Sequence, residues 1–139
     1  MIILDTNVLS EPLRPAPAAS VVEWLDAQAP ETLYLTTITL AEMRFGIAAL
    51  PGGKRKTALA ERLEDAVVPF FTDRILSFDE PSSREYADLR AQARAQGLSL
   101  GDFDSLIAGI ARAHHFEVAT RDTAPFEAAG VRAVINPFE

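Results

Sequence analysis

The sequence predicts an α/β fold, in which a central parallel five-stranded sheet is flanked by helices on both faces. Short apolar runs alternate with longer amphipathic stretches along the whole chain, as strands alternate with helices in this class. The apolar runs are almost continuous, as expected of strands buried on both faces. The 139 residues show no internal repeat and no linker, so we expect a single domain over residues 1–139.

The first elements follow from local composition. Met1–Leu4 is a short, continuous apolar run and predicts a buried strand. A polar stretch that contains three prolines follows it. Ser20–Ala27 predicts a helix with Val21, Trp24 and Leu25 on one side. Thr32–Thr36 is rich in β-forming residues and predicts the second strand.

The middle of the chain predicts two helices and a strand. Ile38–Leu50 is amphipathic and is stopped by Pro51-Gly52-Gly53. Lys54–Val68 predicts a further helix that opens with a basic run, which we expect to be a solvated helix start. Arg74–Phe78 predicts the third strand.

The last part repeats the alternation. Ser82–Gln96 predicts a helix that ends at Gly97, and Leu100–His115 predicts another that follows Ser99. Phe116–Thr120 and Val131–Ile135 predict the fourth and fifth strands. The segment Phe126–Ala129 between them predicts a short helical turn.

The composition excludes several classes of protein. A hydrophobic fraction of 48% argues against disorder, and the absence of cysteine excludes a disulfide framework and a thiolate metal site. No apolar run reaches the ~20 residues that span a bilayer, and the start does not resemble a secretory signal, so we expect a cytoplasmic protein. The net charge of −7 argues against a broad nucleic-acid surface, but it allows a local basic rim around an acidic centre.

Two acids follow predicted strands. Asp5 closes the first strand, and Asp122 follows the fourth in the segment ATRD. In parallel α/β folds the functional crevice lies at the carboxyl ends of the strands, so both side chains are expected there. The alternative for each is a turn-forming or helix-capping aspartate.

Two further acids lie on apolar helix faces. Glu42 shares its face with Ile38 and Phe45, and a carboxylate on such a stripe is costly unless it is paired, with Arg44 for example, or binds a metal. Asp104 has Ile107, Ala108 and Ala111 as its helical neighbours.

Asp102 lies on another face of the same predicted helix. With Ser99 as the N-cap, Asp102 would complete a capping box, so we assign it a mainly structural role. It also stays a candidate for a supporting role near Asp104.

The four acids would repel one another if they converged. A divalent cation removes that repulsion, and carboxylates without cysteine suit Mg²⁺ or Mn²⁺. The small polar residues Thr6, Asn7 and Thr120 could then hold a carboxylate or a metal-bound water in place. For Thr6 and Asn7 the alternative is a role in turn and cap formation.

The same residues carry a resemblance to a known family. The segments ILDTNVLSE, ITLAEMRFGIAALPGGKRK, DSLIAGIARAH and VATRD, with AGVRAVINPFE, are similar to PIN-domain ribonucleases and, more narrowly, to VapC-type toxins of bacterial toxin–antitoxin pairs. The resemblance covers essentially the whole chain, in the same order and at similar spacing.

The resemblance implies a function and a set of site residues. It implies a Mg²⁺- or Mn²⁺-dependent endoribonuclease that is a homodimer, is silenced by a cognate antitoxin and enters toxin–antitoxin complexes. Asp5, Glu42, Asp104 and Asp122 match the family's metal-binding acids. Thr6, Asn7 and Thr120 match the small polar residues of that pocket. Relatives often carry T-R-N followed by D-F, whereas here Asp122 comes earlier and Pro125 takes the later place.

The expected chemistry is hydrolysis of an RNA phosphodiester by a metal-activated water. We assign Asp5 and Asp104 as direct ligands, Glu42 as a ligand or water-orienting group, and Asp122 as a ligand through water. Arg44 and Arg121, beside motif residues, are the expected contacts for RNA.

Two other functions stay open at this point. A phosphatase with an aspartyl nucleophile would need a second aspartate two positions after Asp5, where Asn7 stands. A partner-binding domain with an inactive acidic pocket would bind Mn²⁺ weakly or not at all.

Overall fold

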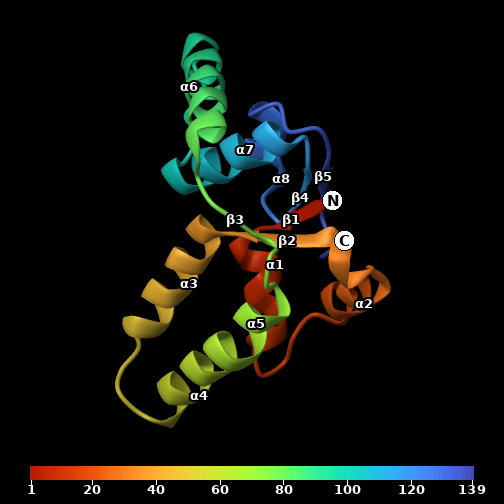
Figure 1. The fold of residues 1–139 in the computed structure, drawn as a ribbon, viewed down its shortest axis with the longest axis vertical. Coiled ribbons are helices and arrows are strands. Elements are labelled where there is room, and N and C mark those ends of the chain that lie inside the picture. The colour runs from red at the N-terminus through yellow and green to blue at the C-terminus, as the bar shows by residue number, and fades with distance from the viewer.

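A sheet of five parallel strands forms the centre of the computed structural model, which describes all residues 1–139 (Figure 1). The strand order is β3-β2-β1-β4-β5. The strands are β1 (Ile2–Leu4), β2 (Leu33–Thr36), β3 (Ile75–Leu76), β4 (Glu117–Ala119) and β5 (Val134–Ile135). Every neighbouring pair is parallel, which confirms the predicted fold class.

Helices cover both faces of this sheet. In Figure 1 α6, α7 and α8 lie above the sheet, and the helices from α1 to α5 lie below it. The α-helices are α1 (Thr6–Ser10), α2 (Ala19–Ala27), α3 (Thr37–Ala48), α4 (Lys54–Arg62), α5 (Val68–Phe70), α6 (Glu80–Ala95), α7 (Asp102–His114) and α8 (Thr123–Ala128). Short turns of other helix types are η1 (Glu11–Leu13), η2 (Pro30–Thr32) and η3 (Leu63–Val67). No helix combines the length and the apolar character that crossing a bilayer would need.

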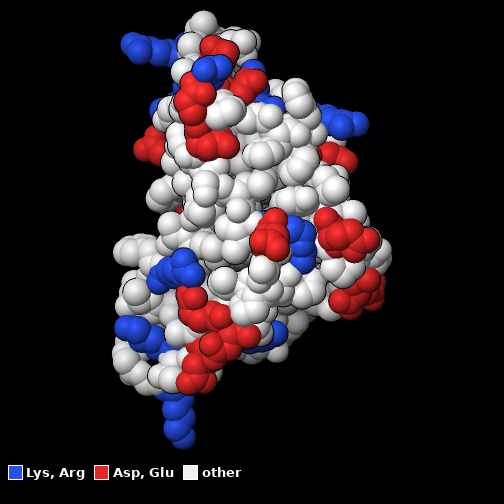
Figure 2. Space-filling model, viewed as in Figure 1, with Lys and Arg blue, Asp and Glu red and all other residues white.

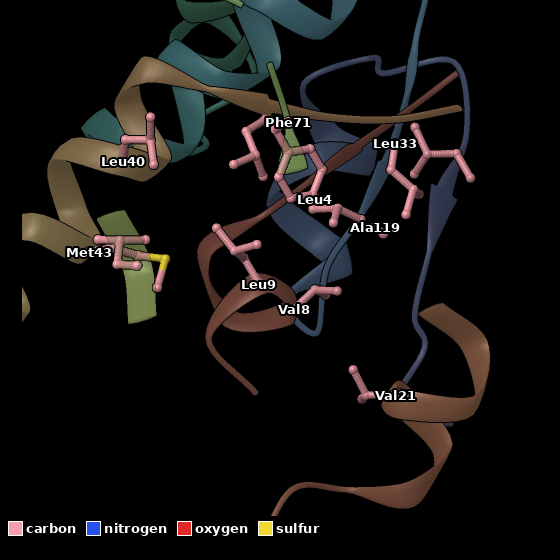
Figure 3. Packing of buried hydrophobic residues seen from close by; sticks show 12 residues of the cluster. Leu4, Val8, Leu9, Val21, Leu33, Leu40, Met43, Phe71 and Ala119 are labelled. Atoms are coloured by element: carbon pink, nitrogen blue, oxygen red, sulfur yellow. The ribbon is translucent and has the colours of Figure 1, made fainter. Parts of the chain in front are cut away.

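Two apolar cores form because successive side chains of a strand point to opposite faces of the sheet. Ile2 and Leu4 of β1 enter the core beneath the sheet, whereas Ile3 enters the core above it. The lower core joins side chains of β1 and β2 to those of α1, α2 and α3. Figure 3 shows this core, with Val21 of α2 at its edge. Because helices cover both faces of the sheet, both sets of side chains on each strand are buried, and the strands are almost continuously apolar.

The segment after β1 is more ordered than its three prolines suggested. It forms α1 and the short 3₁₀ turn η1, with Pro12 in the first turn of η1. Proline is tolerated there because the first N–H groups of a helix have no partner within it. The sequence pattern did not reveal these elements because each is five residues or shorter.

The predicted helix Lys54–Val68 is not one regular helix. It begins at Lys54 as expected, but it changes to a π-turn over Leu63–Val67, in which the N–H of Val68 donates to the carbonyl of Leu63. The cause is Pro69, which has no N–H and whose ring cannot pack against a regular α-helical turn before it. The predicted strands Arg74–Phe78 and Val131–Ile135 are also shorter, with two paired residues each.

The sheet order places the switch point beside β1. The chain goes from β1 outward to β2 and β3 on one side, and returns to β4 and β5 on the other. Ligand crevices in such sheets open at the carboxyl ends of the strands next to that point. Asp5, directly after β1, and Thr120, directly after β4, lie at this edge, and the backbone N–H of Asp5 donates to the carbonyl of Ala119 at 2.9 Å.

Candidate active site

Asp5 is buried, with 5% of its surface exposed, and both of its carboxylate oxygens are held. Oδ1 accepts a hydrogen bond from the backbone N–H of Thr6 at 2.8 Å, so Asp5 is the N-cap of α1. Oδ2 accepts one from the hydroxyl of Thr120, also at 2.8 Å. Asp5 therefore caps α1 and also binds Thr120, at the edge of the sheet where the candidate site is expected.

Glu42 reaches the same place from α3. Its Oε1 accepts a hydrogen bond from the Thr6 hydroxyl at 2.8 Å, and the residue is half-buried. The alternative pairing of Glu42 with Arg44 is wrong, because Arg44 makes a two-pronged ion pair with Glu64 at 2.7 and 3.0 Å. Thr6 thus joins the acid of α3 to the end of β1.

Asp104 is half-buried in the first turn of α7 and makes no side-chain hydrogen bond with the rest of the chain. The predicted capping box of Ser99 and Asp102 is wrong. Gly97, at φ 73°, closes α6, and α7 begins only at Asp102 after Gly101 as its N-cap. Asp102 is therefore at the first helical position, too early to complete a box.

The side chain of Asp102 points to solvent. It is 85% exposed and pairs with Arg90 at 3.1 Å. Asp104 has no such partner, so the two acids of this turn have different environments.

Asp122 joins the site through Asn7. The Asn7 amide donates to Asp122 Oδ2 at 3.5 Å and to the Thr120 hydroxyl at 3.4 Å, and its carbonyl oxygen accepts from the N–H of Arg121 at 3.1 Å. Asp122 precedes α8, but its side chain makes no cap bond, so the helix-cap alternative is wrong for it. The residue is exposed.

Burial and neighbouring carboxylates raise the pKa values of Asp5, Glu42 and Asp104. Burial raises the pKa of Asp5, the hydrogen bonds from Thr120 and Thr6 oppose that rise, and the charges of Glu42 and Asp122 add to it. Burial likewise raises the pKa of Asp104, with further rises from Asp5 and Asp122.

Glu42 follows the same pattern. Burial raises its pKa, the hydrogen bond from Thr6 lowers it, and the charge of Asp104 raises it again. Four separate segments of the chain therefore bring their carboxylates within electrostatic range at one edge of the sheet.

The side chains do not form a closed metal cage as they stand. No three Asp, Glu or His side chains are placed closely enough around one point to hold an ion. The donor set nevertheless fits a hard cation, because it consists only of oxygen atoms and because positive charge would relieve the repulsion between its acids.

The comparisons with known proteins identify the family. The family model described as PIN domain matches residues 2–131. The chain belongs to the PIN-domain family. This confirms the resemblance and, with the parallel sheet, the predicted PIN-like fold.

Full-length relatives of this PIN domain are known in several bacteria. The plasmid stability protein StbB of Pseudomonas syringae pv. tomato is 58% identical over all of this chain and 99% of its own length. The VapC ribonuclease Y4jK of Sinorhizobium fredii is 55% identical over the same shares of the two chains. The crystal structure of FitAcB from Neisseria gonorrhoeae contains a chain that is 51% identical, with a TM-score of 0.96 and coverage of 100% and 99%.

One buried acid beside the site was not singled out in the sequence. Glu11 is 3% exposed and lies in η1, at the end of the segment DTNVLSE. Its signal in the sequence was weak, since glutamate is almost always exposed unless it is paired.

Proposed function

We propose that this PIN domain is a divalent-metal-dependent endoribonuclease and the toxin of a toxin–antitoxin pair. The observation that carries the proposal is the convergence of four carboxylates, three of which have raised pKa values, at the switch point of the sheet. The relatives named VapC ribonuclease and tRNA(fMet)-specific endonuclease VapC, at 55% and 31% identity, support the substrate class. The relative named Toxin FitB, at 51% identity, supports the biological role.

Mg²⁺ or Mn²⁺ is the cation that we propose for the site. Asp5 and Asp104 would hold it directly, with Glu42 as a ligand or water-orienting group and Asp122 linked through water. Such a cation supplies a water of lowered pKa and neutralises charge on the leaving oxygen.

The chain's own residues hold this arrangement. Thr6 and Thr120 fix the carboxylate of Asp5 from its two sides, and Thr6 also holds one oxygen of Glu42. The other oxygen of Glu42 is free to orient a water molecule or to accept its proton. Asn7 ties the turn that carries Asp122 to α1.

A cognate antitoxin is the proposed partner, in a complex built on a homodimer of this chain. Among solved structures, that of FitAB bound to the IR36 DNA fragment has a chain 51% identical to this one at a TM-score of 0.95. We extend that assembly, a toxin–antitoxin complex on DNA, to this chain as part of the proposal.

The test is RNA cleavage by the purified chain. We expect a single-stranded RNA to be cut with Mn²⁺ or Mg²⁺, and the cutting to stop with EDTA or in Asp5→Asn protein. In cells, expression without the antitoxin should arrest growth, and co-expression of the antitoxin should restore it. Cleavage that persists in EDTA would contradict the proposal.

The phosphatase alternative receives no support from the site. The residue two positions after Asp5 is Asn7, whose amide is engaged with Thr120, Arg121 and Asp122. An acid or base is therefore missing where that mechanism needs one. Beryllium fluoride should leave Asp5 unmodified, which separates the two functions.

A further inference from the structure

Glu11 is a buried carboxylate that the proposed chemistry does not use. Its side chain is 4% exposed, and its Oε2 has no hydrogen-bond partner. Two arginines approach its other oxygen, Arg14 at 3.1 Å and Arg121 at 3.8 Å. A buried carboxylate is costly without compensating charge, so these two guanidinium groups are what make its burial tolerable.

Arg121 is held in place and yet remains half exposed. Its guanidinium carbon lies 3.9 Å from the centre of the Phe138 ring, and its backbone N–H is bound by Asn7. The side chain is 51% exposed. Since the next residue is Asp122, this cation and one acid of the cluster come from the same turn of the chain.

Arg14 lies near a different acid of the cluster, Glu42. It lines a cleft of ≈ 300 Å³ whose wall also includes Thr6 and Glu42. Its side chain is 63% exposed. The two arginines that share Glu11 thus adjoin two different acids of the site.

This group carries a surplus of positive charge, unlike the other ion pairs. Elsewhere one arginine meets one carboxylate, as in Arg44 with Glu64, Arg84 with Glu80, Arg90 with Asp102 and Arg112 with Glu85. Here two arginines share one acid, which leaves a net charge of +1. Figure 2 shows only small, scattered groups of Lys and Arg on the face in view, interleaved with acids, so a local cation pair matters for binding a polyanion.

We propose that Glu11, Arg14 and Arg121 form an arginine clamp, in which the buried glutamate positions two guanidinium groups to bind RNA phosphates that flank the acidic cluster. The forked donors of arginine match the oxygens of a phosphate. RNA is favoured over an acidic protein because Arg14 lines the same cleft as Glu42 and Arg121 directly precedes Asp122, so each adjoins an acid of the proposed site. The clamp rests on the proposed ribonuclease function.

The test measures RNA binding without cleavage. In an Asp104→Asn background with Mn²⁺ present, the affinity for a labelled single-stranded RNA is measured by fluorescence anisotropy over a series of salt concentrations. Each phosphate contact adds about 0.7 to the slope of log affinity against log salt. This slope is negative, and we expect Arg14→Ala and Arg121→Ala each to make it less steep by about 0.7. The double variant should make it less steep by about 1.4.

One control variant and two lysine variants test whether the change in slope is specific to these two arginines. Arg84→Ala removes the same charge from an exposed ion pair on α6, and we expect it to leave the slope unchanged. Arg14→Lys and Arg121→Lys should restore the slope because the charge returns. In the otherwise wild-type enzyme the alanine variants should raise KM with little change in kcat. A merely structural role would lower the melting temperature without changing the slope.

Glu11→Gln tests whether Glu11 positions the two arginines or only neutralises their charge. If the glutamate only neutralises the arginines, its removal adds net positive charge and tightens RNA binding. If it positions them, binding weakens by about 3- to 10-fold despite that added charge, because preorganisation is lost. Circular dichroism checks that this variant folds, and if it does not, the exposed arginine variants still decide the question.

The outcomes distinguish the clamp from the ribonuclease. Unchanged slopes in both arginine variants, with RNA bound as before, overturn the clamp and leave the ribonuclease standing. RNA binding that depends on the arginines, in a wild-type protein that never cleaves RNA, supports the clamp and contradicts the nuclease. Unchanged RNA binding with loss of antitoxin binding overturns the RNA clamp and assigns the arginines to the protein partner. An Asp104→Asn protein that binds no RNA overturns the clamp.

Discussion

Asp5 and Asp79 have the same local role and opposite electrostatic environments. Both follow a strand at the carboxyl edge of the sheet, and both are the N-cap of the helix that comes next. Asp79 is exposed, and the hydrogen bonds that it accepts from Ser82 lower its pKa. Asp5 is buried, and this burial raises its pKa in spite of its own hydrogen bonds. The neighbours from distant segments, rather than the cap itself, separate a structural acid from a candidate ligand.

The two shifts have opposite consequences for stability. The pKa of Asp79 is lowered, so Asp79 stabilises the fold above its usual value of 3.8, and this contribution is lost as the pH falls through its folded-state pKa. The pKa of Asp5 is raised, so its contribution is fully present below 3.8 and is lost as the pH rises through its folded-state pKa. At neutral pH the ionised Asp5 therefore opposes folding, and a bound cation would remove that penalty.

The largest expected difference is in catalysis. Asp5→Asn should lower the rate of metal-dependent RNA cleavage by about 100-fold or more, since even residues behind a metal's ligands are worth 10- to 100-fold. Asp79→Asn should leave the rate close to that of the wild type, because this acid lies outside the cluster. Cleavage of a labelled RNA under single-turnover conditions measures both. Equal losses in the two variants would show that Asp5 is no closer to the reaction than Asp79 is.

The next largest difference is stabilisation by metal. At a Mn²⁺ concentration of 100 times the dissociation constant, the free energy of unfolding at neutral pH should rise by about 2.7 kcal/mol. Asp79→Asn should show the same rise, and Asp104→Asn should show little of it. Denaturant unfolding with and without Mn²⁺ measures the effect, and a rise of the same size in Asp104→Asn would exclude this acid from the site.

A smaller difference concerns the metal-free protein. Asp104 has a raised pKa, so Asp104→Asn should melt at a higher temperature than the wild type at pH 7, whereas Asp79→Asn should melt at a lower one. The Asp104 difference should shrink as the pH falls through its raised folded-state pKa towards 3.8. The Asp79 difference should shrink only below 3.8, as the pH falls through its lowered folded-state pKa. Melting curves in EDTA over this pH range provide the measurement. If Asp79→Asn instead raised the melting temperature, ionised Asp79 would not stabilise the fold as proposed here.

The smallest expected effect concerns the hydrogen bond between Thr120 and Asp5. The hydroxyl of Thr120 donates to Asp5, and this bond lowers the pKa of Asp5. Thr120→Val should raise that pKa further, shift the acid limb of the pH–rate profile to higher pH, and cost about 1 kcal/mol of stability. Thr57→Val is the control, since Thr57 is exposed on α4 and bonds only to a nearby carbonyl. If the acid limb does not move, the ionisation of Asp5 does not control the rate.

Much of the fold followed from the sequence, because strand and helix periodicities report burial directly. The parallel sheet was predicted because its apolar runs are nearly continuous, α3 because Ile38–Leu50 is amphipathic, and the end of α6 because Gly97 follows it. The five-residue α1 was missed, since a segment so short has no clear period. The π-turn before Pro69 depends on a backbone hydrogen bond that composition does not encode. The domain extent of residues 1–139 stays a prediction, although the family model covers 2–131.

Candidate site residues could be proposed from the sequence where an acid stood out against an apolar background. Glu42 and Asp104 were singled out in this way, but Phe45, expected on the same apolar stripe as Glu42, is 75% exposed. Glu11 was missed because one of its charge partners, Arg121, is more than a hundred residues away in the sequence and is itself held against Phe138. The predicted capping box of Ser99 and Asp102 was wrong because α7 begins only at Asp102, after Gly97 and Gly101, and has no serine cap.

Calorimetric titration with Mn²⁺ tests most directly whether the acids at this edge of the sheet share a cation. Asp104 and Asp102 stand two residues apart on one helix turn and carry the same charge, but only Asp104 lies among the other acids. We predict that Asp104→Asn weakens Mn²⁺ binding by about 10-fold or more, whereas Asp102→Asn binds as the wild type does. Equal binding by both variants, or no binding by the wild type, would contradict the account.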